Sequence, residues 1–252
     1  MGKKGGSKHL KRKPAPVVWS VERKKFAWIG KPSAGPHRAA KCITLTLGLR
    51  DALGLAKTAR EAKTIIARGK VLVNGKIRRD KSYPAGPMDV ITFPESNSSY
   101  RVLPSPKGLK LHPIDDDEAH FKLCKIEHKT SAKNGHVQLA LHDGTNILVR
   151  VADSKKPVED VYNTTDTLKI GFEERNILGR ARLAKGVPVL LIGGKNVGKY
   201  GKVFEIEEVT GQKRRERLVT IEDGNGNRLQ TTLNFVFVIG ETEPYISLPE
   251  AK

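Results

Sequence analysis

Apolar residues follow a helical period in one part of this chain and alternate with polar residues, as in β-strands, in most of the rest. The helical part starts near Leu45 and Leu49, which begin a run of leucines four positions apart. Thr58 and Glu61 then have the spacing of a capping box, in which the Thr58 hydroxyl accepts from the amide of residue 61 and Glu61 bonds back to the amide of residue 58. This pattern predicts two short helices, the second over about residues 59–68.

A β-hairpin is predicted directly after the second helix. Gly69 provides the helix stop, and valines alternate with polar residues from position 71. Asn74 and Gly75 favour a type I′ turn, because both central residues of that turn need positive φ. A turn and a further strand are expected in residues 82–93.

Strands dominate the rest of the sequence. The runs with strand character are HFKLCKIEHKT, HVQLALHDG, NILVRV, TLKIGF and RNIL, followed nearer the end by VPVLLIGG, KVFEIEEV, RLVTIED, RLQTTL and FVFVIG. The expected fold class is α+β, multi-domain and predominantly β. The expected segments are a basic N-terminal extension (1–41), a small helical module with a hairpin (42–106), a central β domain (107–178), a small SH3-like barrel (179–240) and a C-terminal tail (241–252).

The basic residues gather in the first two of these segments. The 252 residues include 46 Lys plus Arg and 27 Asp plus Glu, which gives a formal net charge of +19. Residues 1–41 hold 12 basic side chains and one acidic side chain, and residues 42–106 hold 11 basic and five acidic ones. Residues 107–180 hold 12 of each sign. The excess indicates a polyanionic partner that is bound by the first part of the chain.

The N-terminal extension is rich in glycine and proline and cannot bury enough apolar surface to fold by itself. It nevertheless contains three large aromatic residues, Trp19, Phe26 and Trp28, which a merely solubilising tail does not need. These rings could stack on bases or pack on the following module, and the sequence leaves both alternatives open.

Residues that could form a metal site, a disulfide or a phosphate-binding loop do not have the pattern that such a site requires. Four histidines lie 8, 8 and 6 positions apart and the two cysteines lie 82 apart, which fits neither a zinc site nor a disulfide framework. The acidic run 115–118 is expected to be a solvated loop or a contact to a basic neighbour. Residues 193–199 fit the phosphate-loop pattern G-x-x-x-x-G-K, but Tyr200 follows in place of Ser or Thr, and a strand follows in place of a helix. We therefore expect no metal, no cofactor, no small-molecule substrate, no membrane span and no secretory signal.

The segment GLAKTAREAKTIIARGKVLVNGKIRRDKSYPAGPMDVITF resembles the RNA-binding module shared by bacterial ribosomal protein S4, some pseudouridine synthases and some tyrosyl-tRNA synthetases. Its A-[KR]-[ST]-x-x-[EQ]-A start, its G-x-V-x-V-N-G hairpin and its closing D-V-I occur in that order. The basic residues of the helix and hairpin would form one cationic face for folded RNA, and an ordinary solvated face is the alternative. These residues are Arg60, Lys63, Arg68, Lys70, Lys76, Arg78 and Arg79.

A second resemblance covers the glycine loop. The sequence KGVPVLLIGGKNVGKYGKV is similar to the KOW motif of ribosomal proteins and elongation factors. Two strands would be joined by a loop in which Gly194, Gly198 and Gly201 allow tight turns and close backbone approach. The lysines of the loop would contact RNA, or alternatively would contact nothing.

The order of basic extension, helical module, β domain and KOW barrel resembles the S4e family of small-subunit ribosomal proteins, found in archaea and in the eukaryotic cytosol. The resemblance implies a non-catalytic structural role on cytoplasmic ribosomes, with small-subunit ribosomal RNA and neighbouring small-subunit ribosomal proteins as partners, and no homo-oligomer. The RNA-binding residues expected in the extension are Lys3, Lys4, Lys8, His9, Lys11, Arg12, Lys13, Trp19, Arg23, Lys24, Lys25, Lys31, His37, Arg38 and Lys41. Those expected in the helical module are Lys57, Thr58, Arg60, Lys63, Arg68, Lys70, Asn74, Lys76, Arg78, Arg79 and Lys81, and those in the glycine loop are Lys195, Asn196, Lys199, Tyr200 and Lys202.

Two other functions remain open from the sequence. An RNA-modifying enzyme of the pseudouridine synthase or methyltransferase type could carry an appended S4-like module, although the strands that follow contain no recognisable catalytic motif. A KOW-bearing transcription or chromatin factor would explain the C-terminal part of the chain but not the helical module.

Overall fold

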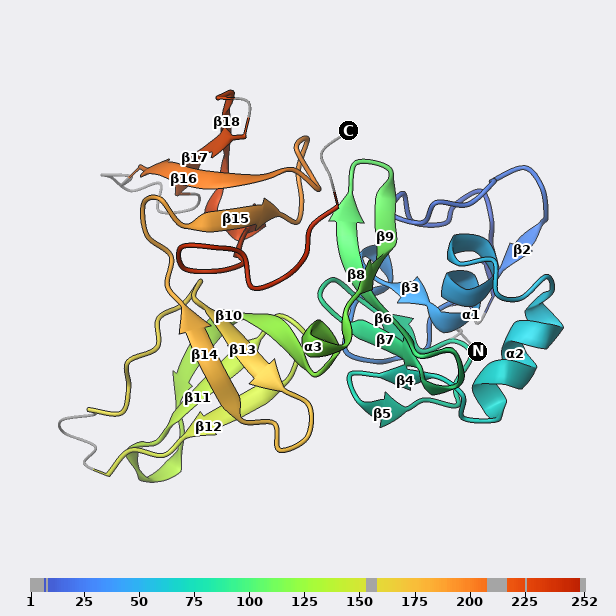
Figure 1. Ribbon diagram of the computed structural model, residues 1–252, viewed down its shortest axis with the longest axis horizontal. Helices are drawn as coiled ribbons and strands as arrows, with labels where there is room; N and C mark the ends of the chain where they lie inside the picture. Colours follow the sequence, from blue (N-terminus) through green and yellow to red (C-terminus); the bar gives the residue numbers. More distant parts are fainter. Residues whose placement is uncertain (1–6, 8, 153–157, 208–216, 225, 250–252) are drawn as a thin grey trace, which may run out of the picture. The chain divides into compact units, whose positions relative to one another are not determined.

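The computed structural model describes residues 7, 9–152, 158–207, 217–224 and 226–249 (Figure 1). The chain forms two compact units. Unit 1 comprises the described residues up to Leu103 together with Lys107–Ala119, and unit 2 comprises Pro104–Pro106 and the described residues from His120 onward. No helix in the described part of the chain is long and apolar enough to cross a membrane.

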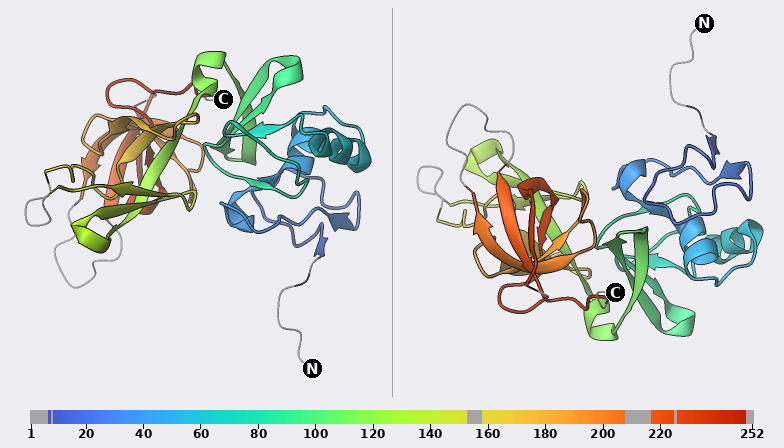
Figure 2. Two further views of the ribbon diagram at one scale, coloured as in Figure 1. Left: turned by 90° about the horizontal axis from the view of Figure 1, so that it is seen from below. Right: turned by 90° about the horizontal axis from the view of Figure 1, so that it is seen from above.

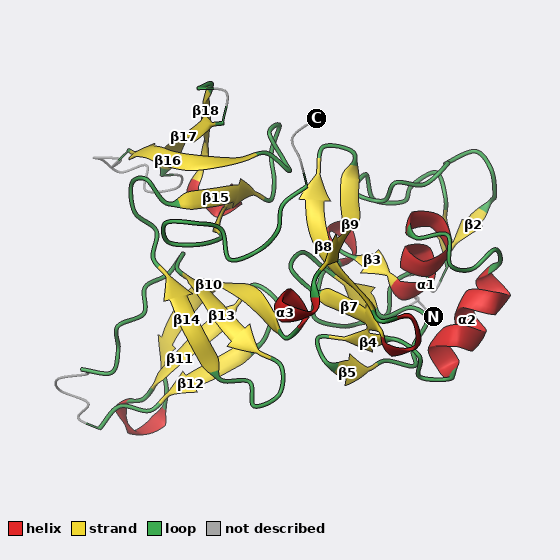
Figure 3. Ribbon diagram, viewed as in Figure 1, coloured by secondary structure: helices red, strands yellow, loops and turns green. Residues whose placement is uncertain are grey.

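The helices are short, and the two that the sequence predicted lie in unit 1 (Figure 3). α1 (Leu45–Leu47) continues as a wider π turn (Gly48–Ala52). α2 (Ala59–Ala67) follows as predicted and packs against α1. The first helix is shorter than the leucine spacing indicated, because the helical run stops before Gly54, which adopts the left-handed conformation (φ 68°) typical of a helix end.

The main sheet of unit 1 has the strand order β5–β4–β7–β8–β9. Its strands are β4 (Leu72–Val73), β5 (Lys76–Ile77), β7 (Val90–Phe93), β8 (Ser98–Ser105) and β9 (Gly108–Ile114). Two smaller antiparallel pairs join β1 (Leu10–Lys11) to β2 (Trp28–Ile29) and β3 (Ile43–Thr44) to β6 (Pro84–Ala85). The β4–β5 turn has the predicted geometry, with φ of 51° at Asn74 and 72° at Gly75.

The long β8–β9 hairpin was not predicted (Figure 3). β8 is buried along most of its length on both faces, so its sequence shows no alternation of apolar and polar residues. Residues 107–119, which include β9, belong to unit 1, whereas the expected central β domain begins at residue 107.

The N-terminal extension folds onto the rest of unit 1. Ala15, Trp19 and Ile29 join the apolar core around α1 and α2. Only one of the three large aromatic residues packs in this way: Trp19 is 2% exposed, whereas Phe26 and Trp28 are each 59% exposed. Packing on the following module is therefore confirmed for Trp19, and stacking on bases stays a prediction for Phe26 and Trp28.

Unit 2 contains two five-stranded antiparallel sheets (Figure 2). The first has the order β12–β11–β10–β13–β14, with β10 (Phe121–Ser131), β11 (Val137–Leu141), β12 (Asn146–Val149), β13 (Thr167–Gly171) and β14 (Ile177–Ala181). The second has the order β18–β17–β16–β15–β19, with β15 (Pro188–Leu191), β16 (Tyr200–Ile206), β17 (Leu218–Asp223), β18 (Arg228–Thr232) and β19 (Val236–Val238). These are the strands that the alternation predicted, and the curled second sheet is consistent with a small barrel.

Lys125 joins the two sheets of unit 2. It lies on β10, is 5% exposed, and its Nζ donates to the carbonyl oxygens of Leu233 (3.1 Å), Asn234 (3.3 Å) and Val236 (2.7 Å). A buried ammonium is tolerated at this position because the three carbonyl groups replace its water shell.

The acidic run forms a short helix, α3 (Asp116–Ala119), and not the expected loop. Glu118 of this helix lies beside the buried Arg101, whose guanidinium donates to the Glu118 carbonyl oxygen at 2.9 Å and lies 3.8 Å from its carboxylate. Burial lowers the pKa of Arg101 to about 10, and the Glu118 charge opposes this shift. The expected contact to a basic neighbour is therefore confirmed for Glu118.

Candidate nucleic-acid interface

The capping box sets the start of α2 and thereby the positions of its cations. The Thr58 hydroxyl accepts from the amide of Glu61 at 3.2 Å, as predicted. The Glu61 carboxylate accepts from the amide of Lys57 at 2.9 Å, one residue before the amide that was predicted. Ala62 and Ile66 face the core, so the other faces of the helix are turned to solvent. These faces carry the exposed cations Arg60, Lys63 and Arg68.

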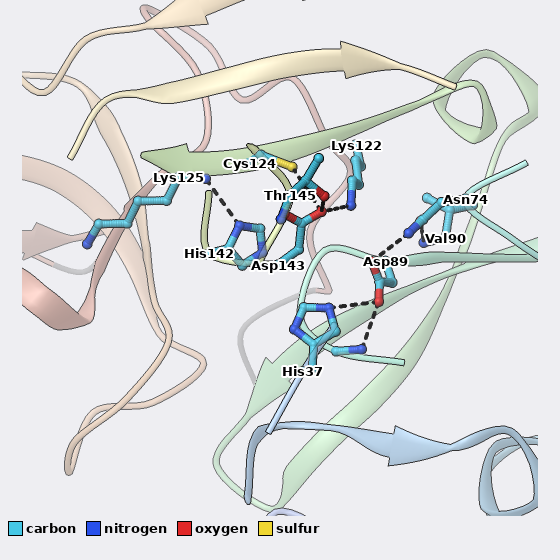
Figure 4. Close-up of polar contacts among 11 residues, drawn as sticks. His37, Asn74, Asp89, Val90, Lys122, Cys124, Lys125, His142, Asp143 and Thr145 are labelled. Carbon is cyan, nitrogen blue, oxygen red and sulfur yellow. Dashed lines mark hydrogen bonds and ion pairs between the residues drawn. The ribbon is translucent and has the colours of Figure 1, made fainter. Parts of the chain in front are cut away.

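A buried carboxylate, Asp89, holds the hairpin turn (Figure 4). Its Oδ1 accepts from Asn74 Nδ2 at 2.7 Å, and the Asn74 Oδ1 accepts from the amide of Val90 at 2.9 Å. Its Oδ2 accepts from the amide of Gly86 at 2.9 Å and lies 2.9 Å from His37 Nε2. Asn74 and His37, both expected to bind RNA, are therefore engaged in fixing the fold around the turn.

The cations of α2 and of the hairpin are neighbours, because the hairpin passes over the end of the helix. A Cβ placed on Gly69 would lie 3.2 Å from Cγ2 of Ile77 and 3.6 Å from Nε of Arg79. Gly69 also has a φ of 77°, the left-handed conformation of the predicted helix stop. Glycine at this position thus brings Arg79 to the end of α2.

Five of the seven predicted cations are exposed and two are engaged within the protein. Lys70 pairs with Glu95 at 2.8 Å, and the guanidinium of Arg78 lies 4.5 Å from the centre of the Tyr83 ring. Lys57, Thr58 and Lys81 are exposed beside the other five. We use the term cationic face for the five exposed residues Arg60, Lys63, Arg68, Lys76 and Arg79.

The acidic side chains near the cationic face accept hydrogen bonds from other groups of the protein. Glu61 belongs to the capping box, and Asp80 accepts from the Ser33 hydroxyl at 2.6 Å and from the amide of Ser82 at 2.9 Å. Among the described residues, no ion pair joins a carboxylate to any cation of this face. The face therefore keeps its positive charge for a partner.

The N-terminal extension adds further exposed cations to unit 1. Arg23 is not among them, because it is half-buried and its Nη1 donates to the carbonyl oxygens of Lys13 and Ala15, both at 2.8 Å. Lys3, Lys4 and Lys8 lie outside the described residues. The exposed candidates are His9, Lys11, Lys13, Lys24, Lys25, Lys31, Arg38 and Lys41.

Three candidates of the extension must be removed from the predicted interface, because they are buried: Arg12, Trp19 and His37. The Arg12 guanidinium lies 3.8 Å from the carboxylate of Asp51 and 5.4 Å from the centre of the Phe26 ring. The Trp19 indole donates to the Cys42 carbonyl oxygen inside the core, and His37 contacts Asp89. A partner in solution cannot reach these side chains.

The glycine loop joins strand β15 to strand β16, as predicted. A Cβ on Gly198 would lie 2.6 Å from the Cα of Ser105, and a Cβ on Gly201 would lie 2.2 Å from the carbonyl oxygen of Glu222. Close backbone approach therefore requires both glycines. Three lysines are exposed here: Lys195 and Lys199 in the loop, and Lys202 on β16. Two other candidates are half-buried: Asn196 in the loop and Tyr200 at the start of β16.

The groups that hold the candidate interface in place, Asp89 and Arg23, were not predicted in that role. Asp89 was visible only as the first letter of D-V-I, and its partners come from positions 37, 74 and 86. Arg23 was assigned to RNA, although it binds carbonyl groups of its own chain. Residue type and local spacing contain no signal for such contacts, because the partners are distant in the sequence.

Three family models match separate parts of this chain. The model of Ribosomal family S4e matches residues 96–177, that of the S4 domain matches residues 51–91, and that of the RS4NT (NUC023) domain matches residues 4–40. The S4 match includes α2, the β4–β5 hairpin and Asp89.

Similar proteins extend over nearly the whole chain. The small ribosomal subunit protein eS4 of Staphylothermus marinus is 49% identical over 251 residues, which cover 99% of each chain. That of Methanocaldococcus jannaschii is 43% identical over 249 residues, which cover 98% of this chain and 100% of the relative. The crystal structure of the 30S ribosomal protein S4e from Thermoplasma acidophilum is similar with a TM-score of 0.65 at 29% identity, over 80% of this chain and 96% of that one.

Proposed function

The chain belongs to the S4e family of ribosomal proteins, and from this premise we propose that it is a structural constituent of the small ribosomal subunit that binds and stabilises the RNA of that subunit. The observation that supports RNA binding most directly is the cationic face. Its five residues are exposed, lie within the S4-domain match, and pair with no carboxylate among the described residues.

The charge of the cationic face suits a phosphate backbone. Each Lys or Arg that contacts an RNA phosphate releases condensed counterions and contributes roughly 0.7–0.9 to the slope of log affinity against log salt. At 0.1 M salt, a single contact therefore raises the affinity about five- to eightfold. The capping box and Asp89 hold these cations in place before binding, so that little ordering is needed when RNA arrives.

The finer parts of the proposal concern residues, catalysis and assembly. The RNA-contacting set consists of the cationic face, the neighbouring Lys57, Thr58 and Lys81, the exposed cations of the extension and the lysines of the glycine loop. The protein acts without catalysis, as a single copy in each subunit of a cytoplasmic ribosome. Residues 107–180 hold equal numbers of basic and acidic side chains, which supports contacts with neighbouring ribosomal proteins.

Sedimentation with small ribosomal subunits that lack this protein tests the proposal. We expect the purified chain to migrate with the subunits in low salt and to be released in high salt. The variant Arg60→Ala/Lys63→Ala should be released at lower salt than the parent chain. Lys133→Ala, which removes an exposed cation from unit 2, is the matched control and should behave as the parent.

Two results would contradict the proposal. The first is a chain that stays free of the subunits in low salt. The second is isomerisation of uridine, or transfer of a methyl group, on ribosomal RNA by the purified chain, which would support the RNA-modifying enzyme instead.

A further inference from the structure

Two large aromatic side chains stand exposed on the N-terminal extension. Phe26 and Trp28 are each 59% exposed, in the same segment in which Trp19 is 2% exposed. An exposed aromatic ring offers a flat apolar face that a partner can cover. The pair is therefore a candidate contact surface.

The β1–β2 pair presents Trp28 from a defined position. Leu10 pairs with Ile29, which is buried in the core of unit 1. Lys11 pairs with Trp28, and both of these residues are exposed. The His9 ring meets the Trp28 ring edge-on, with the ring centres 5.8 Å apart. The indole is thus carried by a strand that is anchored in the core, with a cation directly beside it.

Phe26 is supported by a buried cation. The Arg12 guanidinium lies 5.4 Å from the centre of the ring, and Arg12 is 2% exposed. Its Nε and Nη1 have no hydrogen-bond partner among the described residues, so the ring is one of the few groups that face this charge. The exposed part of the Phe26 ring is available to a second flat group.

The charges around the two rings define the chemistry of the partner. The extension has one acidic side chain, Glu22, and it pairs with Lys25 at 3.1 Å. The exposed cations near the rings include Lys11, Lys13, Lys24 and Lys31. A ligand that suits this surface is anionic and offers flat faces for stacking. RNA meets both conditions where it is single-stranded, because its base faces are covered in a duplex.

We infer that Phe26 and Trp28 form a stacking platform for unpaired bases of single-stranded RNA. The inference rests on the proposed function and names the kind of RNA that this part of unit 1 takes. Stacking tolerates any base, so the platform selects unpaired over paired RNA and not one sequence over another.

Tryptophan fluorescence tests the inference, because the chain has only two tryptophans and Trp19 is buried. The full-length chain is titrated with a single-stranded oligo(A) of about 12 nucleotides and with an RNA duplex of the same length. We expect the single strand to quench the fluorescence of Trp28 and the duplex to leave it unchanged. Trp28→Ala should weaken single-strand binding roughly tenfold and leave duplex binding and the salt slope as in the parent. Trp28→Phe, which keeps a stacking ring, should retain most of the affinity.

Lys24→Ala is the matched control, since Lys24 is an exposed cation two residues from Phe26. It should weaken single-strand and duplex binding by the same factor and lower the salt slope for both. Thermal unfolding of each variant should match that of the parent, because the substituted side chains lie at the surface.

The outcomes separate the inference from the function on which it rests. Equal single-strand affinity of Trp28→Ala and the parent would overturn the stacking platform while leaving RNA binding intact. So would quenching of Trp28 by oligo-glutamate but not by oligo(A), which would indicate an acidic protein partner. A parent chain that binds neither the single strand nor the duplex would contradict the proposed function itself.

Discussion

The cationic face of unit 1 and three basic side chains of unit 2 are placed in opposite ways. In unit 1, the cationic face is exposed and pairs with no carboxylate of the described residues. In unit 2, Lys122 bonds to the buried carboxylate of Asp143, Lys125 is buried among three carbonyl oxygens, and Arg180 lies 3.0 Å from the carboxylate of Asp166. A charge that is satisfied inside the protein has little effect on an external partner. We therefore propose that the exposed cationic face of unit 1 binds RNA, whereas these three cations of unit 2 stabilise the fold.

The number of basic residues does not reveal this difference. Residues 107–180 contain 12 of them, as many as the N-terminal extension. What differs is the number of acidic residues within reach and the depth at which the cations lie. We therefore expect substitutions of the buried or paired charged residues of unit 2 to change stability, and substitutions on the cationic face to change RNA binding.

Lys125→Met should have the largest effect on stability. Methionine keeps much of the apolar chain but leaves three carbonyl oxygens without their shared donor, which lowers the free energy of unfolding of unit 2 by about 3 kcal/mol. RNA affinity in filter binding should stay within about twofold of the parent. Unchanged urea unfolding together with lost RNA affinity would contradict the structural role of this lysine and indicate that it contacts RNA.

Asp143→Asn should destabilise unit 2 by about 1–3 kcal/mol near neutral pH, because Lys122 is left beside an uncharged group. Burial acts to raise the pKa of Asp143, but the charge and hydrogen bond of Lys122 and the amide of Thr145 hold it below its ordinary value of 3.8. The folded pKa lies below the unfolded one, so this stabilisation is present above about pH 4 and is lost as the pH falls through the folded value. Unfolding free energies measured from pH 6 to pH 2 should fall less steeply in the variant than in the parent, and parallel curves would contradict the assignment.

Lys63→Ala should reduce RNA affinity about five- to eightfold at 0.1 M salt and lower the salt slope by roughly 0.7–0.9. The side chain is exposed on α2, so the free energy of unfolding should change by less than about 0.5 kcal/mol. Filter binding over a range of salt concentrations measures the first effect and thermal unfolding the second. A slope equal to that of the Lys133→Ala control would remove Lys63 from the interface.

Lys199→Ala in the glycine loop should have the smallest effect. Residues 181–252 hold 11 basic and nine acidic side chains, so we expect a fall in the salt slope smaller than that of Lys63→Ala, below roughly 0.7. The two slopes are compared on the same RNA. A larger fall for Lys199→Ala would make the loop the stronger RNA contact and would break the division between the units.

The local elements of the fold could be predicted because their causes are local. The hydrogen bond from the Glu61 amide to the Thr58 hydroxyl and the Asn74–Gly75 turn each depend on residues within a few positions, and both formed as predicted. The first helix is shorter than its leucine spacing indicated because the helical run stops before Gly54, and β8 was not predicted because burial on both faces removes its periodic pattern. Local spacing also gave no indication that β9 belongs to unit 1.

The sequence predicted which cations could form the candidate interface, but not which of them are exposed and which are buried. Lys63 and Arg12 have the same charge, but Lys63 is exposed while Arg12 lies inside unit 1 near Asp51. Trp19 and Trp28 are likewise the same residue type, and only long-range packing separates the buried ring from the exposed one. Such differences arise from contacts between distant parts of the chain, which a single sequence does not display.

The salt dependence of RNA binding by the chain and by a variant without the cationic face tests the central claim most directly. The variant carries alanine at Arg60, Lys63, Arg68, Lys76 and Arg79, and its thermal unfolding should match that of the parent. If each of the five residues contacts a phosphate, the slope of log affinity against log salt for small-subunit ribosomal RNA falls by roughly 3.5–4.5. A folded variant whose slope stays within roughly one unit of the parent would contradict the claim that this face binds the RNA.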